Sequence, residues 1–584
     1  MLKKKLLKQA RGIEKADKVF KNAIYVDVFN ERLMESDIAV ADGIIIGVGD
    51  YQAEEEIDLS GKIVIPGLID AHLHLESSMT NVDHFARAVI PKGTTTIVAD
   101  PHEIANVAGL TGIKYLLQAG KAQAWNFNLM LPSCVPASEF EHSGAELKAA
   151  DLKTLIGEEG IFGLGEVMNY PAVINGESEI WSKIEMAAEL FKDGHAPGLL
   201  GKDLNAYLLA GIAADHEATT AAEALEKISK GMYIMIREGS VTRDLVSLLP
   251  AVNSSNSSRF LFATDDRHPG DLIDEGQIDF AVRKAVQYGL SPLRAIKMAT
   301  INAAEALGIK KLGAVAPGYR ADLLVLDNLR NFEVEKVYKD GKLVAENGTL
   351  LKSIDDQISL TQDNFSSKEI EEKIFNSVKI GDISEKDFKL PQGKKYRTMN
   401  LVNNQIVTQK GTVSFDNLPV TNEDLKNKSL NKLAVVERHK KTGNVGLGLL
   451  GGFGLKKGAI ATSVGHDSHN IIVVGINKKD MLKAVKKIEK INGGIVVVDN
   501  ETVVNSLSLS IAGLMSDKPL EEVAAKLSEL RLDAQKLGVK NENPFMTISF
   551  MALPVIPKLK VTDKGLFSSE EFDFVSLVVN DKST

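Results

Sequence analysis

Two histidines separated by one residue, His72 and His74, are the first feature of the chain that could do chemistry. They lie in the string PGLIDAHLHLESS, which begins at Pro66 and reads as a buried strand. Side chains two positions apart on a strand point to the same face, so both imidazoles can bind one divalent ion. The pair alone is a weak signal, because two nearby histidines are often only surface or core residues.

Further groups of the kinds that bind metals follow along the chain, each near the end of an apolar run. They are Glu166 in GLGEVMN, His195 in KDGHAPG, His216 in AADHEA and Asp265 in FATDDRHP. Each alone has a structural explanation as a surface acid, a loop turn, a helix cap or a salt-bridge partner. Their occurrence together, in order and at strand ends, favours one shared metal site.

The elements that must position these groups are predicted between residues 66 and 312. Short apolar runs alternate there with helical stretches such as SEIWSKIEMAAELFKD and TAAEALEKISKG. The expected strands are TTTIVAD, WNFNLMLPS, IFGLGEVM, GIAADHEA, MYIMIREGS and FLFATDD. Repeated strand–helix units of this length predict a (β/α)₈ barrel, in which chemistry gathers at the C-terminal ends of the strands.

The segments on either side of the barrel are β-rich. We expect an N-terminal helix and the first part of a small composite β-sandwich in residues 1–65, and its second part in residues 313–365. A charged, Ser-rich linker, 366–394, then leads to a C-terminal α+β domain, 395–584. The fold class is therefore α/β, a TIM-like barrel inserted in a β-sandwich with one further domain.

The composition narrows the functional classes. The 584 residues include 69 basic and 78 acidic side chains, a net charge of −9 that gives no general attraction to nucleic acid or to anionic membranes. No apolar run reaches the ~18 residues of a membrane span, and the N-terminus lacks the features of a signal peptide. The one cysteine, Cys134, fits a reducing compartment, so we predict a cytoplasmic protein.

Several of these strings together resemble a known family. PGLIDAHLHLESSM resembles the opening strand of the amidohydrolase superfamily, and the combination with VADPHEIANV, LPSCVPA, GLGEVMNYP and TDDRHP resembles the bacterial-type adenine deaminases. The C-terminal strings GHDSHN and FMTISFMALPVIPKLKVTDKGLF extend that resemblance over nearly the whole chain. Glu166 stands where many superfamily members carry a carboxylated lysine, which argues against the hydantoinase and dihydroorotase branches.

The resemblance implies hydrolysis of adenine to hypoxanthine and ammonia in purine salvage. It implies a binuclear site for a divalent metal, Mn²⁺ or else Fe²⁺. It also implies a homo-oligomer such as a dimer, and a purine base as the small-molecule ligand. Carried over position by position, the metal ligands are His72, His74, Glu166, His195, His216 and Asp265.

A bound divalent ion lowers the pKa of water from ~15.7 to about 7, and Asp265 can take its proton as general base. A second acid must protonate the departing amine, and Glu217, Glu103 and Asp266 are the candidates. A further set can bind substrate or an additional metal: His102, Asp266, Arg237, Cys134, His466 and His469.

Each member of that further set also has an ordinary structural explanation. Cys134 can be a small buried apolar residue, Arg237 can pair with Glu238, and GHDSHN can be a hydrogen-bonded turn. Two other functions stay open at this point. One is an amidohydrolase acting on a different cyclic amide or amidine, and the other is a metal-free scaffold protein of the same fold.

Overall fold

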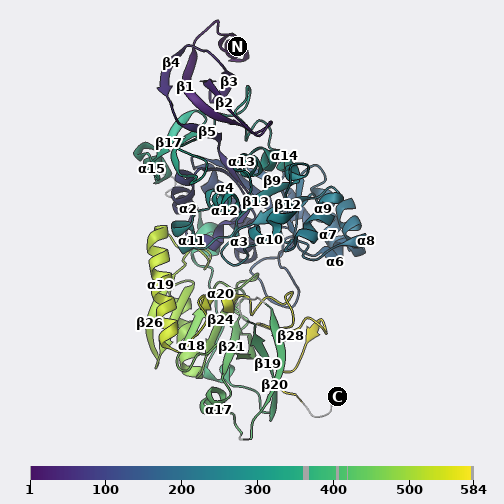
Figure 1. Ribbon diagram of the computed structural model, residues 1–584. Helices are drawn as coiled ribbons and strands as arrows, with labels where there is room; N and C mark the ends of the chain where they lie inside the picture. The colour runs from purple at the N-terminus through teal and green to yellow at the C-terminus, as the bar shows by residue number, and fades with distance from the viewer. Residues whose placement is uncertain (1, 360–366, 403–406, 417, 580–584) are drawn as a thin grey trace.

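The computed structural model describes residues 2–359, 367–402, 407–416 and 418–579. Figure 1 shows three units in a row, with an N-terminal β-unit at one end, a barrel in the middle and a C-terminal unit at the other end. The two chain ends lie at opposite ends of the molecule. No helix in the described part of the chain is long and apolar enough to cross a membrane.

The N-terminal β-unit is built from two segments that are distant in the sequence. Helix α1 (Leu2–Ala10) precedes its first strands, and the second segment returns after the barrel. β5 pairs antiparallel with β15, with Ile63 opposite Leu326, so both segments share one sheet, which is the composite arrangement expected. The strands are β1 (Ala16–Asp27), β2 (Arg32–Ala41), β3 (Ile44–Val48), β4 (Ala53–Asp58), β5 (Ile63–Pro66), β15 (Leu323–Leu326), β16 (Val334–Lys339), β17 (Lys342–Glu346) and β18 (Thr349–Leu350).

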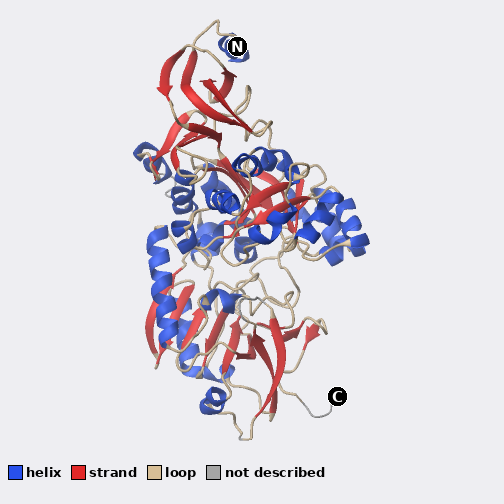
Figure 2. Cartoon of the chain, viewed as in Figure 1, coloured by secondary structure: helices blue, strands red, loops and turns tan. Residues whose placement is uncertain are grey.

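The middle unit is a distorted parallel barrel surrounded by helices (Figure 2). It closes where β14 pairs with β6, whereas among the described residues β10 and β11 form no strand pair. There Ala213 N–H, just before β11, donates to the Lys192 carbonyl at 3.0 Å. Its strands are β6 (Leu68–His74), β7 (Thr94–Ala99), β8 (Asn126–Leu131), β9 (Ile161–Val167), β10 (Phe191–Gly194), β11 (Ala214–Asp215), β12 (Tyr233–Arg237), β13 (Phe260–Ala263) and β14 (Asp265–Asp266).

One strand was missed in the sequence. The stretch SEIWSKIEMAAELFKD was expected to be one helix, but α7 (Ser178–Met186) ends early and Phe191–Gly194 forms the barrel strand β10. Only four residues long, this strand carries no alternation that could reveal it beside an amphipathic helix. The other helices around the barrel include α2 (Val82–Val89), α3 (His102–Ala108), α4 (Leu110–Lys121), α8 (Gly201–Leu209), α9 (Ala221–Ser229), α11 (Pro269–Asp274), α12 (Ile278–Gln287) and α14 (Ile301–Leu307).

The C-terminal unit is a three-layer structure around an eight-stranded sheet. Neighbouring residues of its strands point to opposite faces, so Ala434 and Val436 pack with α18 (Lys478–Lys490), whereas Leu433 and Val435 pack with α19 (Leu520–Lys536) and α20 (Pro544–Ser549). The sheet contains β19 (Lys395–Leu401), β20 (Thr408–Ser414), β21 (Leu430–Val436), β22 (Val445–Gly451), β23 (Ala459–Thr462), β24 (Ile471–Gly475), β25 (Gly494–Asp499) and β26 (Thr502–Ser508).

The C-terminal unit docks on the mouth of the barrel. Asn81 N–H donates to the Ser516 carbonyl at 3.0 Å, and the hydroxyl of Thr562 donates to the Phe140 carbonyl at 2.7 Å. The loop 463–470, between β23 and β24, is held against the barrel by Asn470, whose Nδ2 donates to the His142 carbonyl at 2.7 Å. The boundary expected between residues 365 and 366 lies outside the described residues, and the segment after it contains α16 (Lys368–Ile370) and two short helical turns.

Candidate metal centre

His72 and His74 end strand β6 and face each other across a short gap. Both are buried, and their Nε2 atoms are 3.3 Å apart. The outer nitrogen of each ring meets an acceptor, since His72 Nδ1 lies 2.9 Å from Asp193 Oδ2 and His74 Nδ1 lies 3.1 Å from the Asp100 carbonyl. Each Nδ1 therefore carries the ring hydrogen, which leaves both Nε2 lone pairs free to bind a metal.

Glu166, at the end of β9, lies between two pairs of histidines. Its Oε1 is 2.7 Å from His74 Nε2 and 3.2 Å from His72 Nε2. Its Oε2 is 2.9 Å from His195 Nδ1 and 3.7 Å from His216 Nε2. One carboxylate thus reaches two nitrogen pairs with its two oxygens, which is the arrangement required of a group that bridges two ions.

The residue before Glu166 must be small. Gly165 packs against the carboxylate of Asp100, and a Cβ atom at this position would collide with Asp100 Oδ2. Gly165 therefore leaves room for the Asp100 side chain next to Glu166.

Asp265 completes the cluster from β14, the strand that pairs with β6 where the barrel closes. Its Oδ1 lies 3.2 Å from His74 Nε2, and its Oδ2 accepts a hydrogen bond from Arg237 Nη1 at 3.0 Å. Its backbone has a φ of 57°, in the left-handed region that a non-glycine residue adopts only when its surroundings impose it. The pairing of β14 with β6 imposes this conformation and aims the carboxylate inward.

Six residues, which we call the barrel cluster, fit a divalent metal. They are His72, His74, Glu166, His195, His216 and Asp265. The ligand atoms of His72, Glu166, His216 and Asp265 all lie within 4.8 Å of one another, and those of His74, His102 and Glu166 form a second such group. In the described part of the chain, Glu166 Oε1 is buried without a hydrogen-bond partner. Imidazole nitrogens and carboxylate oxygens are the donors that Zn²⁺, Mn²⁺ and Fe²⁺ take in proteins.

The charges of the cluster are strongly coupled. Burial alone would raise the pKa of Glu166, but His74 and the contacts from His195, His216 and His72 outweigh it and hold the pKa well below its usual range. Burial opposes ionisation of Asp265 in the same way, and His72, His74 and Arg237 hold its pKa well below normal. Both carboxylates are therefore ionised.

Asp193 is a functional residue that the sequence reasoning missed. Its Oδ2 accepts from His72 Nδ1 at 2.9 Å and lies 3.7 Å from His216 Nδ1, so it orients two histidines of the cluster. Carboxylates in this role fix the tautomer of a ligating histidine. Asp193 could have been found in the sequence from its spacing, because it lies two residues before His195 and therefore on the same face of an extended segment. That segment had been expected to be part of a helix.

The candidates for a proton donor differ in their environments. Arg237 Nη2 contacts Glu217 Oε2 at 3.2 Å and Asp244 Oδ2 at 3.1 Å. Arg237 does not pair with Glu238, because Glu238 accepts a hydrogen bond from Lys284 at 2.6 Å.

Asp266 has a different setting. It accepts a hydrogen bond from the Ser77 hydroxyl through Oδ1. Burial, and after it the charge of Asp265, raise the pKa of Asp266.

The four remaining candidates divide into two groups. His102, His466 and His469 gather around Glu103, and we call these four residues the interdomain cluster. His466 Nδ1 lies 2.7 Å from Glu103 Oε1, His102 Nε2 lies 3.4 Å from the same oxygen, and His469 Nε2 contacts Glu103 Oε2. Cys134 is buried in the hydrophobic core of the barrel, 3.2 Å from the Ser133 hydroxyl.

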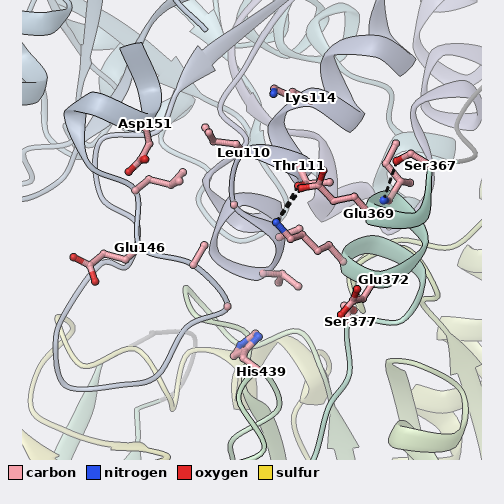
Figure 3. A pocket seen from close by; sticks show the side chains of 18 of the residues that line it. Leu110, Thr111, Lys114, Glu146, Asp151, Ser367, Glu369, Glu372, Ser377 and His439 are labelled. Atoms are coloured by element: carbon pink, nitrogen blue, oxygen red, sulfur yellow. Dashed lines mark hydrogen bonds and ion pairs between the residues drawn. The ribbon is translucent and has the colours of Figure 1, made fainter. Parts of the chain in front are cut away.

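A cavity of about 650 Å³ lies away from the barrel cluster (Figure 3). It opens between α4, the segment after residue 366 and His439 of the C-terminal unit, and no residue of the barrel cluster lines it. Two pairs of its charged side chains form ion pairs, Glu369 with Lys373 at 3.0 Å and Glu372 with Lys379 at 3.2 Å. Glu369 also accepts from the Thr111 hydroxyl at 2.6 Å.

Comparisons with known proteins agree on both large units. Residues 63–344 match the amidohydrolase family, and residues 405–573 match the adenine deaminase C-terminal domain. The chain is 57% identical over 580 residues to the adenine deaminase of Petrotoga mobilis, covering 99% of this chain and 100% of that protein. It is 45% identical to the adenine deaminase of Clostridium acetobutylicum, covering 97% and 99%.

Among solved structures, the β-aspartyl dipeptidase of Fervidobacterium islandicum AW-1 matches 57% of this chain and 98% of its own, with 16% identity and a TM-score of 0.44.

Proposed function

The chain belongs to the adenine deaminase family, and we propose from the barrel cluster how it hydrolyses adenine to hypoxanthine and ammonia. The observation that carries the mechanism is the position of Glu166, whose two oxygens each reach a different pair of histidines. This favours a site for two divalent ions over a single-metal site. The relatives' names and the C-terminal domain weigh against an amidohydrolase with another substrate, and the ligand set weighs against a metal-free scaffold.

Six residues would hold the metal: His72, His74, Glu166, His195, His216 and Asp265. We propose Mn²⁺, with Fe²⁺ as the alternative, on the strength of the family resemblance. When bound, such an ion lowers the pKa of a coordinated water from ~15.7 to about 7, which makes it a nucleophile at neutral pH. Asp193 fixes the ring of His72, and the Asp100 carbonyl fixes that of His74.

Asp265 is the proposed general base. Its carboxylate is ionised and faces the Nε2 atoms of His72 and His74 through Oδ1, while Arg237 holds Oδ2. Oδ1 is therefore the atom that receives the proton of the attacking water. The hydrogen bond from Arg237 to Oδ2 keeps this carboxylate from turning away.

Asp266 is the group best suited to protonate the departing amine. Its raised pKa favours a protonated carboxyl, and because Ser77 donates to Oδ1, the proton resides on Oδ2. Glu217 pairs with Arg237 and is engaged there. Glu103 has a pKa well below its usual range in spite of its burial, because His466, His469 and His102 surround it. We therefore assign the acid to Asp266 rather than to Glu217 or Glu103.

The experiment that tests this function is ammonia release by Mn²⁺-loaded protein supplied with adenine, adenosine or cytosine. We expect turnover of adenine and of neither other compound, and loss of turnover after chelation that Mn²⁺ restores. Turnover of adenosine without adenine would overturn the substrate assignment. A matched series loaded with Fe²⁺ or Zn²⁺ ranks the metals by kcat.

We further propose a cytoplasmic homodimer that acts in purine salvage and takes a purine base as its small-molecule partner, without binding nucleic acid or membranes. The buried Cys134 suits a reducing compartment, and the dimer rests on the family resemblance alone. Light scattering of the metal-loaded protein tests the dimer, since a mass near 63 kDa would mean a monomer.

A further inference from the structure

The C-terminal unit contributes a histidine to the neighbourhood of the barrel cluster. His466, in the loop 463–470, lies 2.7 Å from Glu103, and Glu103 begins helix α3 directly after His102. His102 Nδ1 in turn lies 3.7 Å from Glu166 Oε1. His466 is thus separated from the bridging carboxylate by two side chains, although it is distant in the sequence.

Hydrogen bonds fix the proton positions in this interdomain cluster. Gly465 N–H donates to His469 Nδ1 at 3.2 Å, so Nδ1 is an acceptor and the ring hydrogen is on Nε2. That Nε2 contacts Glu103 Oε2. Because a protonated Nε2 has no lone pair to offer a metal, His469 supports Glu103 and does not bind an ion.

The ring of His466 is held on two sides. Its Nδ1 faces Glu103 Oε1, and one ring face stacks on Phe550 with centroids 4.9 Å apart and planes 13° from parallel. These two contacts leave the ring no freedom to rotate, so the direction of Nε2 is set. His466 is 5% exposed, and its Nε2 has no hydrogen-bond partner among the described residues.

The groups near His466 belong to the same mouth of the barrel. Asp266, which follows Asp265 of the barrel cluster, and His268 both lie within electrostatic range of His466. His268 Nε2 is likewise buried and without a partner in the described part of the chain. Two buried ring nitrogens without a partner in the described part of the chain, His466 Nε2 and His268 Nε2, therefore accompany Asp266 beside the barrel cluster. An unpaired buried polar atom is destabilising unless a ligand satisfies it.

We propose that His466 Nε2–H donates a hydrogen bond to a ring nitrogen of the purine base, so that the C-terminal unit supplies a specificity-determining residue of the active site. This inference rests on the proposed deaminase function. Unlike His72 and His74, which hold metal in the proposed function, His466 has carboxylates as its charged neighbours. Burial opposes its charge, but Glu103, 2.7 Å from Nδ1, together with Asp266 and Asp467 outweighs burial and raises the pKa of His466 to about 9, so Nε2 carries a hydrogen. Unsubstituted ring nitrogens of adenine are acceptors. Glu103 is then a positioning residue that acts through His466.

Two substitutions separate the two nitrogens of this ring. His466→Asn keeps an amide donor near the position of Nδ1, toward Glu103, and removes the group that reaches the base. His466→Gln keeps a donor near the position of Nε2. We expect kcat/KM for adenine to fall about 10- to 150-fold in the first, which corresponds to the 1.5–3 kcal/mol of a charged hydrogen bond, and less in the second. His84→Gln, a half-buried histidine of α2, is the matched control.

The decisive measurement uses 1-deaza-, 3-deaza- and 7-deazaadenine, in each of which one ring nitrogen is replaced by C–H. Their binding to metal-loaded protein is measured by calorimetry, which needs no turnover. We expect one analogue to bind wild type as weakly as adenine binds His466→Asn, and that analogue to lose nothing further in the variant.

Other outcomes overturn the proposal. Equal losses for adenine and all three analogues would mean that His466 only supports the fold. Loss of one metal equivalent from His466→Asn would place this histidine in a metal site instead. Failure of wild type to deaminate adenine would contradict the proposed function, while the binding comparison would still decide the role of His466.

Discussion

The barrel cluster and the interdomain cluster are two groups of histidines and carboxylates that lie side by side, yet they are built for different tasks. In the barrel cluster, Nδ1 of His72 faces Asp193 and Nδ1 of His74 faces the Asp100 carbonyl. Because both are acceptors, each Nε2 keeps a free lone pair. In the interdomain cluster, His469 Nδ1 meets a donor, the Gly465 N–H, so its inner nitrogen carries a hydrogen.

This difference shows that the number of histidines does not define a metal site. For His72, His74 and His469, what matters is whether Nδ1 faces an acceptor or a donor, because that contact sets whether Nε2 can bind an ion. Substitutions that change one cluster without the other therefore test the comparison directly.

The largest effect is expected from Glu166→Gln. An amide offers only one good acceptor in place of a carboxylate that reaches two nitrogen pairs, so the variant should lose metal and kcat should fall at least ~10³-fold. Elemental analysis of the purified variant measures the metal, and ammonia release measures turnover. A variant with two metal equivalents and normal kcat would remove Glu166 from its bridging role.

Asp265→Asn should separate the base from the rest of the barrel cluster. The amide keeps the size of the side chain and an oxygen toward His74, so the fold and most of the metal remain. Loss of the base should lower kcat by about 10²- to 10⁴-fold. Retained wild-type turnover in a fully folded variant would show that another group takes the proton.

The sharpest contrast between the clusters is the pair Asp193→Asn and Glu103→Gln. Asp193 orients His72, so its neutralisation should weaken metal affinity about 10- to 100-fold. Glu103 holds His466, so its variant should keep its metal and raise KM for adenine about tenfold. Competition with a chelator measures the first effect, and steady-state kinetics measures the second.

Equal metal loss in both variants would mean that the two clusters form one metal site, and it would remove the distinction drawn between them.

The sequence could predict that the members of the barrel cluster lie together because they follow strand ends. Parallel strands bring their carboxyl ends to one edge, so order along the chain translates into proximity in space. His72, Glu166 and Asp265 could be placed in this way. Asp193 could not, because its four-residue strand carries no period-two pattern and follows an amphipathic helix.

The interdomain cluster could not be predicted from the sequence, for a different reason. Nothing in a sequence states which loop of one unit docks on which strand end of another, so GHDSHN could be read as a turn or as a small metal site. Arg237 shows the same limit, since its neighbour Glu238 is a local partner in sequence, whereas its partners in space are Glu217, Asp244 and Asp265. Docking and side-chain direction are properties of packing and not of local pattern.

The smallest expected effect concerns pH. Burial lowers the pKa of His469 from 6.5 to about 4, although Glu103 opposes this shift. Protonation would also place a hydrogen on Nδ1 against the Gly465 N–H. Between pH 6.5 and 4 the unfolded chain binds a proton at this position that the folded chain does not, so the stability contributed by neutral His469 is present above pH 6.5 and is lost as pH falls through that window.

His469→Gln removes this titration and keeps a donor toward Glu103. The free energy of unfolding should therefore fall more steeply in wild type than in the variant between pH 6.5 and 5, by at most about 1.4 kcal/mol per pH unit. Denaturant unfolding of both proteins at the two pH values measures the difference, and the shared loss from other carboxylates cancels in it. Parallel pH dependences would mean that His469 binds a proton in the folded state, and the argument that its Nε2 is a donor and never a ligand would lose its basis.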